Sequence, residues 1–287
     1  MIACTVAELM TLRRRAAVWI LGAILIAVVV SLGYLLGWWF TGHPPRGSLL
    51  IRAGPEAKLA YYPLNFIRTT MGVGGGALGG AICMILGALA VGSEYGWGTL
   101  KTALTQQPGR LATFGGRLVA LAVVIACYVV LLFATTAVVS ALLAAVDGQA
   151  LSWPSAGDIL KGVAADWLVS ATWAAFGVML AVLFQQSALA IGIGLVYMLL
   201  FEGLLLGLLG AIGGDTITEI RKLLPSTGAM SLAISFGNAG RPVRILGGAG
   251  AQVALIDANR AVITLAAYLL AFCAIPAAVF RRRDITN

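Results

Sequence analysis

The sequence is poor in charge and in the side chains that build metal or redox sites. Only 10% of its 287 residues are charged and 60% are apolar, with a mean hydropathy of +0.97. This composition excludes an ordinary soluble domain and places the chain in a membrane. The one histidine, His43, has no nearby partner for a metal, and the four cysteines form no CxxC pair. We therefore expect neither a metal site nor a disulfide framework.

The sequence also lacks the motifs of nucleotide chemistry. A Walker A loop requires Gly-Lys followed by Ser or Thr, and no Gly-Lys dipeptide occurs. The stretch Gly74–Gly79 matches GxGxxG but opens an apolar run outside any βαβ unit, so we interpret it as helix packing. Gly72, Gly76 and Gly80 fall at four-residue spacing, which predicts one small-residue helix face that a neighbouring helix can approach closely.

Catalytic groups are missing as well. No apolar run carries paired acids, a set of histidine ligands or a Ser-His combination, so an intramembrane enzyme is not expected. The sequence accordingly predicts no catalytic, cofactor-binding or metal-binding residue in this chain.

Six apolar runs are long enough to cross the ~30 Å hydrocarbon layer as helices. They lie near Ala16–Phe40, Met71–Gly92, Phe114–Val146, Val163–Phe184, Ser187–Ile212 and Ala261–Phe280. The first is longer than a signal-peptide core and no cleavage pattern follows it. We predict an all-α integral membrane protein, with residues 1–287 forming a single six-span domain.

Basic clusters flank the outermost runs. Arg13-Arg14-Arg15 precedes the first run and Arg281-Arg282-Arg283 follows the last. With an even number of spans, these clusters favour a multi-pass protein of the cell (plasma or inner) membrane with both termini cytoplasmic. The total count does not decide the orientation, because nine Lys and Arg lie on the proposed inner segments and ten on the outer ones, but the inner nine are denser. The net charge of +8 fits anionic lipid headgroups, and no basic stripe with interleaved aromatics indicates nucleic acid.

A polar segment, Ser93–Arg110, separates the second and third runs. Helix breakers bound it, with Gly96 and Gly98 on one side and Pro108-Gly109 on the other. Within it Trp97, Leu100 and Leu104 recur at three and four residues, which predicts a short amphipathic helix. Such a short helix is marginal alone in water. It therefore needs a partner surface, or it rests on lipid headgroups.

These residues resemble a loop of the permease subunits of type-2 ABC transporters. The matching residues are Glu94, Gly98, Thr99, Pro108 and Arg110. Further agreement comes from the six runs, from the amphipathic residues 1–15, and from a Leu-Pro-x-x-x-x-Met element at Leu224–Met230. The resemblance implies that residues 93–113 form a cytoplasmic coupling loop, with Glu94, Trp97, Gly98, Thr99, Leu100, Leu104, Pro108 and Arg110 engaging a separate ATPase subunit.

The resemblance also implies the partners. Two copies of a cytoplasmic ABC ATPase would bind ATP and Mg, and a second permease chain, identical or different, would complete the exporter. Residues 1–15 would form an interfacial helix, and residues 213–260 an extracytoplasmic segment of re-entrant or surface helices. The apolar path favours a lipid-like, amphipathic or antibiotic-like substrate.

Glu202 supports an alternative function. It lies inside the fifth apolar run, and an acid within a membrane is by default a functional group. It could line or gate the substrate path. It could instead bind the driving ion of a secondary transporter, a class that often contains helices broken near the bilayer midplane.

Overall fold

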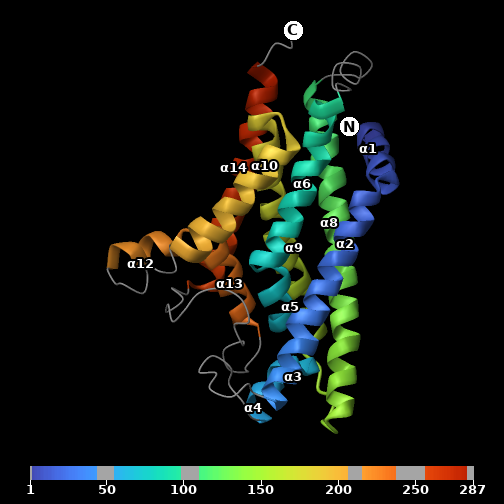
Figure 1. The fold of residues 1–287 in the computed structure, drawn as a ribbon, viewed down its shortest axis with the longest axis vertical. Coiled ribbons are helices and arrows are strands. Elements are labelled where there is room, and N and C mark those ends of the chain that lie inside the picture. The colour runs from blue at the N-terminus through green and yellow to red at the C-terminus, as the bar shows by residue number, and fades with distance from the viewer. Residues whose placement is uncertain (1, 44–54, 98–109, 206–214, 237–255, 283–287) are drawn as a thin grey trace.

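The structure is a computed structural model that describes residues 2–43, 55–97, 110–205, 215–236 and 256–282, and every regular element in these ranges is a helix (Figure 1). The longer elements are α1 (Ile2–Arg14), α2 (Ala16–Val28), η1 (Val29–Leu35), α3 (Leu36–Gly42), α5 (Phe66–Gly74), α6 (Ala77–Trp97), α8 (Arg110–Val146), α9 (Ala156–Phe184), α10 (Ser187–Val196), η4 (Tyr197–Leu205), α12 (Asp215–Lys222), α13 (Pro225–Ser235) and α14 (Ala258–Arg282). The short helical turns α4 (Pro55–Lys58), η2 (Leu59–Tyr61) and η3 (Pro63–Asn65) precede α5.

Among the described residues, four helices are long and apolar enough to cross a membrane. They are Ala16–Gly42, Ala112–Val146, Ala156–Phe184 and Ala258–Val279. They correspond to the first, third, fourth and sixth predicted runs. A fifth candidate is the pair Pro63–Gly74 and Ala77–Ser93, which is bent by 56° between its halves. The described residues therefore form an all-helical membrane protein with four or five spanning helices.

Within the described residues, the second and fifth predicted spans are not single long helices. The second run begins within α5 and continues into α6, so it contains a break that a single uninterrupted helix would not have. The fifth run holds the shorter apolar helix Ser187–Gly203. The end of that run, from residue 206, lies outside the described residues.

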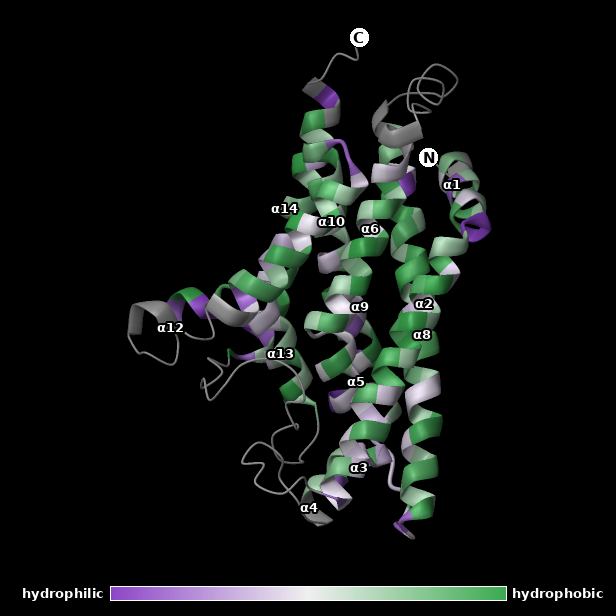
Figure 2. Ribbon diagram, viewed as in Figure 1, coloured by the Kyte–Doolittle hydropathy of each residue, from purple (hydrophilic) through white to green (hydrophobic). Residues whose placement is uncertain are grey.

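The apolar residues are distributed as lipid contact requires. Figure 2 shows hydrophobic residues along the full length of the long helices and hydrophilic ones mainly near their ends and on α12. Large apolar side chains such as Trp19, Ile263 and Leu270 are exposed on the outside of the bundle. In water these surfaces would be costly, whereas lipid tails cover them without penalty.

The centre of the bundle is the crossing of α6 and α9. A methyl group added at Gly177 would lie 2.0 Å from the Met84 carbonyl oxygen, and one added at Gly87 would lie 2.0 Å from the Ala174 carbonyl oxygen. The two backbones therefore touch at positions that only glycine can occupy. Buried Trp173 lies on the same side of α9 and contacts the α6 backbone at Gly80.

The first spanning helix contains a π-helical segment, η1, between α2 and α3. Its buried Tyr34 hydroxyl donates to the Phe66 carbonyl oxygen at 3.0 Å and lies 2.9 Å from the Thr70 hydroxyl. Thr70 in turn donates to Thr136 of α8 at 2.9 Å. These hydroxyls satisfy one another inside the bundle and join η1, α5 and α8.

One aspartate organises the end of the bundle opposite α1. Asp147, just after α8, accepts hydrogen bonds from Trp38 at 2.6 Å and from Lys58 and Tyr62 at 2.9 Å each. The Lys58 ammonium also lies 5.0 Å from the centre of the Trp38 ring. Burial acts to raise the pKa of Asp147, but these three donors and the Lys58 charge outweigh burial and hold it below the ordinary value.

The chain between η4 and α14 includes two short helices. The helix α12 projects to the side of the bundle in Figure 1, whereas α13 is largely buried and packs against α5 and α14. Eleven residues of α13 rise only about 16 Å, too little to cross a membrane. Residues 206–214 and 237–255 of the predicted extracytoplasmic segment lie outside the described residues.

Candidate functional site

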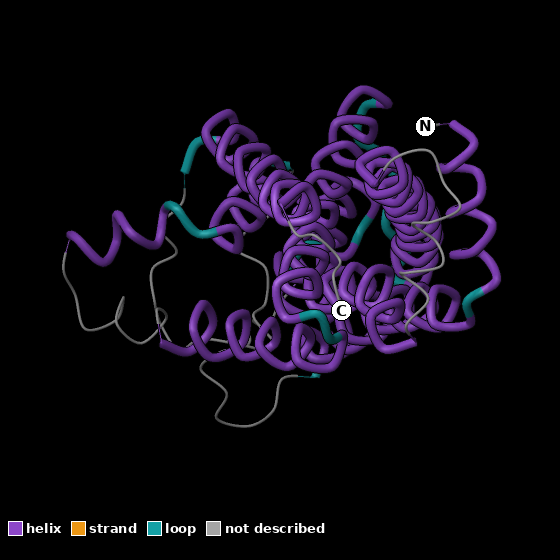
Figure 3. Tube along the Cα trace, turned by 90° about the horizontal axis from the view of Figure 1, so that it is seen from above, coloured by secondary structure: helices purple, strands orange, loops and turns teal. Residues whose placement is uncertain are grey.

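The helix α1 lies on the edge of the bundle, at the end where α6 finishes and α8 begins (Figures 1 and 3). It buries Cys4 and Leu12 while Val6 and Met10 are exposed. A methyl group added at Gly116 of α8 would lie 3.0 Å from the Cys4 Cβ atom, so the two helices are in close contact. One side of α1 thus packs on α8 and the other is an exposed apolar surface suited to a membrane interface.

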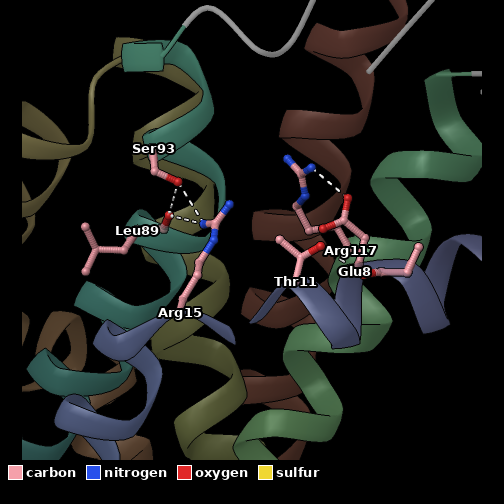
Figure 4. A network of polar contacts seen from close by, with 7 residues as sticks. Glu8, Thr11, Arg15, Leu89, Ser93 and Arg117 are labelled. Atoms are coloured by element: carbon pink, nitrogen blue, oxygen red, sulfur yellow. Dashed lines mark hydrogen bonds and ion pairs between the residues drawn. The ribbon is translucent and has the colours of Figure 1, made fainter. Parts of the chain in front are cut away.

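An ion pair fixes α1 to the first part of α8. The Arg117 guanidinium donates to a Glu8 carboxylate oxygen at 2.8 Å, and the Arg117 side chain is only 6% exposed (Figure 4). A charge buried to this degree requires a partner, because removing it from water costs several kcal/mol. Glu8 provides that partner, so the position of α1 along α8 is specified by charge as well as by packing.

A second polar link joins the α1–α2 junction to the last part of α6. Arg15, the residue between α1 and α2, donates to the Ser93 hydroxyl at 2.8 Å and to the Leu89 carbonyl oxygen at 3.3 Å. Ser93 itself donates to the Leu89 carbonyl oxygen at 2.9 Å. Figure 4 shows Arg15 reaching α6 on one side while Glu8 meets Arg117 on the other. The α1 network, defined here as Glu8, Arg15, Ser93 and Arg117, therefore connects both helices that flank residues 98–109.

Of the predicted coupling residues, the structure describes only the backbone of three, and these three lie at this end of the bundle. Glu94 and Trp97 belong to the last turn of α6 and Arg110 begins α8, and the structure describes none of their side chains. Gly98, Thr99, Leu100, Leu104 and Pro108 lie in the segment 98–109, which is not described. The short amphipathic helix therefore remains a prediction from sequence.

The three predicted packing glycines do not share one continuous helix, because the break between α5 and α6 separates them. Gly72 is in α5, and a methyl group there would meet nothing within 4 Å. Gly76 lies in the break itself. Gly80 is in α6, where a methyl group would lie 2.8 Å from the Trp173 ring. The close contact between α6 and α9 uses Gly87 and Gly177 instead, which the four-residue spacing did not indicate.

Glu202 is buried within η4, with 9% of its surface exposed. Its polar neighbours are Tyr197, on the same element, and Ser226, in the first turn of α13. Neither carboxylate oxygen completes a hydrogen bond within the described residues. Aromatic side chains of α9, η4 and α14 lie near Glu202. The ring centre of Phe176 on α9 is 5.2 Å from the ring centres of both Tyr197 on η4 and Phe272 on α14. The sequence prediction of an acid inside the bundle is thus matched by its burial, while its role is untested.

A second buried acid escaped the sequence analysis. Asp166 is fully buried, and neither of its oxygens has a hydrogen-bond partner within the described residues. The fourth apolar run begins at Val163, so Asp166 was expected near the end of a span. Glu202 was the acid that the sequence placed deep inside one. The helix in fact begins at Ala156, so Asp166 lies well inside it. An aspartate in the first turn of an apolar run was the available signal.

The fold of the described ranges defines the class of the protein: a multi-pass membrane protein whose regular elements there are all helices. The chain belongs to the family described as "Protein of unknown function (DUF2705)", whose pattern matches residues 80–286, more than half of the 287 residues. The match includes Asp166, Glu202 and the segment that links α6 to α8, but not α1. Among curated proteins, none matches the sequence.

Proposed function

We propose that this chain is the permease subunit of an ATP-driven exporter of the type-2 ABC class, with six spans and both termini in the cytoplasm. The observation that supports this most is the α1 network, in which Glu8 pairs with Arg117 and Arg15 binds Ser93. This network joins α1 to α8 and the residue after α1 to α6, and α6 and α8 are the helices that flank the segment resembling a coupling helix.

The network suits a mechanical role for that segment. A coupling helix receives force from an ATPase subunit, and the force reaches the translocation path only if the flanking helices are anchored. Here a buried ion pair binds α8 to α1, and a charge-assisted hydrogen bond from Arg15, the residue that follows α1, binds α6. Displacement of residues 98–109 would then move α1, α6 and α8 together instead of bending one helix end.

The proposal divides the chemistry between chains. Two copies of a separate ATPase subunit would bind ATP and Mg and hydrolyse the nucleotide, and a second permease chain would complete the path. This chain would supply the path itself, with Glu202 lining or gating it, for a lipid-like, amphipathic or antibiotic-like substrate.

A single substitution in the coupling segment tests the proposal. Leu104→Asp places a charge on the predicted apolar side of the segment, so the permease purified from its native membranes should lose its ATPase subunit and its ATP hydrolysis. Anchors of this kind contribute about 2 kcal/mol or more at an interface, which corresponds to at least tenfold weaker binding. The matched control is Thr105→Asp, which places the same charge one residue along, on the predicted polar side.

The two variants separate three outcomes. Loss of the ATPase subunit in Leu104→Asp alone supports the exporter. Loss in both variants would mean that the segment binds the ATPase without the predicted sidedness. Full ATPase binding and full export in an inserted Leu104→Asp variant would contradict the exporter and favour the ion-coupled transporter. The burial of Glu202 without a hydrogen-bond partner among the described residues is the observation that favours that second function.

A further inference from the structure

A carboxyl group from another helix faces the break between α5 and α6, and the described part of the fold gives it no structural role. α5 ends at Gly74, α6 begins at Ala77, and the two halves are bent by 56°. Asp166 of α9 points at this break, since a methyl group added at Gly75 would lie 3.2 Å from its Oδ1 atom and one at Gly74 would lie 4.0 Å from Oδ2. Both oxygens are buried and unpartnered within the described residues.

Charged partners are scarce in the helices packed around Asp166. On α6 the buried Cys83 faces it and lies beside Ser170. On α5 the basic residue is Arg68, which precedes Gly74 by about 9 Å of helical rise. The charged residues of α8, Arg110 and Arg117, are at the N-terminal end of that helix, near α1.

The remaining helices add no counter-charge near the break. The acid and the base on the first turns of α9, Asp158 and Lys161, have side chains that are 51% and 75% exposed, and Arg260 at the start of α14 is also exposed. The sequences of η1, α10 and α13 contain no charged residue. An ionised Asp166 would therefore be a buried charge without an evident counter-ion among these groups, at a cost of several kcal/mol.

The packing around Asp166 limits which ligand could neutralise its buried charge. A methyl group added at Gly75 would lie only 3.0 Å from the Met71 carbonyl oxygen, 3.1 Å from Val169 and 3.2 Å from the Asp166 Oδ1 atom, so even a methyl group would be crowded between Gly75 and the carboxyl. A metal ion needs room and several oxygen ligands at 2 Å or more. In the described residues no group of three or more His, Cys, Asp or Glu could hold one. A proton needs no volume and removes the charge.

We propose that Asp166 is a proton-binding site controlled by the α5–α6 break. With the break packed as in this structure, the carboxyl holds the proton as a neutral acid. When the break loosens, water reaches the carboxyl, the O–H bond breaks, the proton passes to water, and the carboxylate that remains is hydrated. The proposal stands on the geometry of α5, α6 and α9 and does not depend on the exporter assignment.

Infrared spectroscopy of the full chain in lipid nanodiscs tests it. A protonated carboxylic acid has a carbonyl stretch that ionised carboxylates lack, and at neutral pH Asp166 should show it. Because Glu202 is also buried, the measurement uses the Glu202→Gln background. The band should disappear in Asp166→Asn and persist in Asp158→Asn, the matched change at an exposed aspartate of the same helix.

Isotope labelling covers the case in which Asp166→Asn fails to fold. In protein grown with carboxyl-labelled ¹³C aspartate the band should shift in frequency, without any substitution at Asp166. A band that is absent at neutral pH, or that does not shift with labelled aspartate, would show that Asp166 is ionised and would overturn the proposal.

Two glycines of α5 and the break test the control by packing. Gly75→Ala inserts a methyl group against Met71, Val169 and Asp166, so the break must loosen by a few tenths of an ångström. We expect proton affinity to fall about tenfold, a shift of about one pH unit in the midpoint of the band. Gly72→Ala, whose methyl group meets nothing within 4 Å, should titrate as the parent protein does. Equal midpoints for the parent and both variants would contradict control by the break.

Discussion

Asp147 and Asp166 are two aspartates of neighbouring helices in opposite surroundings. Asp147, the residue after α8, accepts hydrogen bonds from Trp38, Lys58 and Tyr62. Asp166, inside α9, has no hydrogen-bond partner within the described residues. The first is a carboxylate that three donors stabilise in its charged form. The second can be stable only as a neutral acid or with a ligand.

The difference separates an acid that links segments of the fold from a buried acid that links none among the described residues. At the end of the bundle a charge can meet basic and aromatic donors from several segments, and it then fixes the relative positions of α3, α4 and the residues before α5. Inside the bundle the same side chain contributes no such link and is a cost to the fold. A group that costs stability without forming a contact is a candidate for function.

The largest contrast should come from the same isosteric substitution at both sites. Asp147→Asn removes the charge and turns an amide toward groups that are themselves donors, so we expect a loss of about 2 kcal/mol in the free energy of unfolding. Asp166→Asn replaces a neutral acid with a neutral amide of nearly the same shape and breaks no hydrogen bond among the described residues, so it should cost less than Asp147→Asn. Thermal unfolding of both variants in one detergent measures the contrast. Equal losses at the two sites would remove the distinction between them.

A smaller effect is expected from one donor of the Asp147 cluster. Trp38→Phe keeps an aromatic ring near Lys58 but removes the N–H group that donates to Asp147 at 2.6 Å. We expect a loss of about 1 to 1.5 kcal/mol. Trp39→Phe, at the exposed neighbouring tryptophan, serves as the control and should be close to neutral. The comparison is made by chemical or thermal unfolding of the two variants at the same lipid or detergent composition.

The smallest effect should be a dependence of stability on acid pH. Because hydrogen bonds and the Lys58 charge hold the pKa of Asp147 below its ordinary value, its contribution is present above the unfolded pKa of about 3.9 and is lost as pH falls through the folded pKa. The difference in melting temperature between the parent protein and Asp147→Asn should therefore narrow below about pH 4. A difference that stays constant from neutral to acid pH would show that charge does not matter at this site.

The spanning helices could be predicted from sequence because lipid demands long apolar runs. The runs beginning near Ala16, Phe114, Val163 and Ala261 all correspond to helices long enough to cross, since a helix satisfies its backbone hydrogen bonds within one segment of the chain. The ends of the helices were predicted less accurately than their existence. α9 begins at Ala156, before its apolar run, because Ser155 caps it by accepting a hydrogen bond from the Asp158 amide.

The candidate sites could be predicted only in part. Glycines at Gly74, Gly75 and Gly76 indicate both close packing and a helix break, and only tertiary contacts decide between them. The Glu8–Arg117 pair joins residues 109 positions apart, and helical periodicity carries no information on such a contact. The role of Leu100 and Leu104 remains a prediction, since these residues lie outside those that the structure describes.

The glycine contacts between α6 and α9 have a consequence for movement. At Gly87 and Gly177 each backbone lies against a carbonyl group of the other helix, so neither helix can slide along its neighbour without a collision. The pair behaves as one rigid body, and Asp166 travels with it. If the chain bends between Gly74 and Ala77, α5 is the helix that moves relative to α6 and α9. The Thr70 hydroxyl, with its contacts, moves with α5.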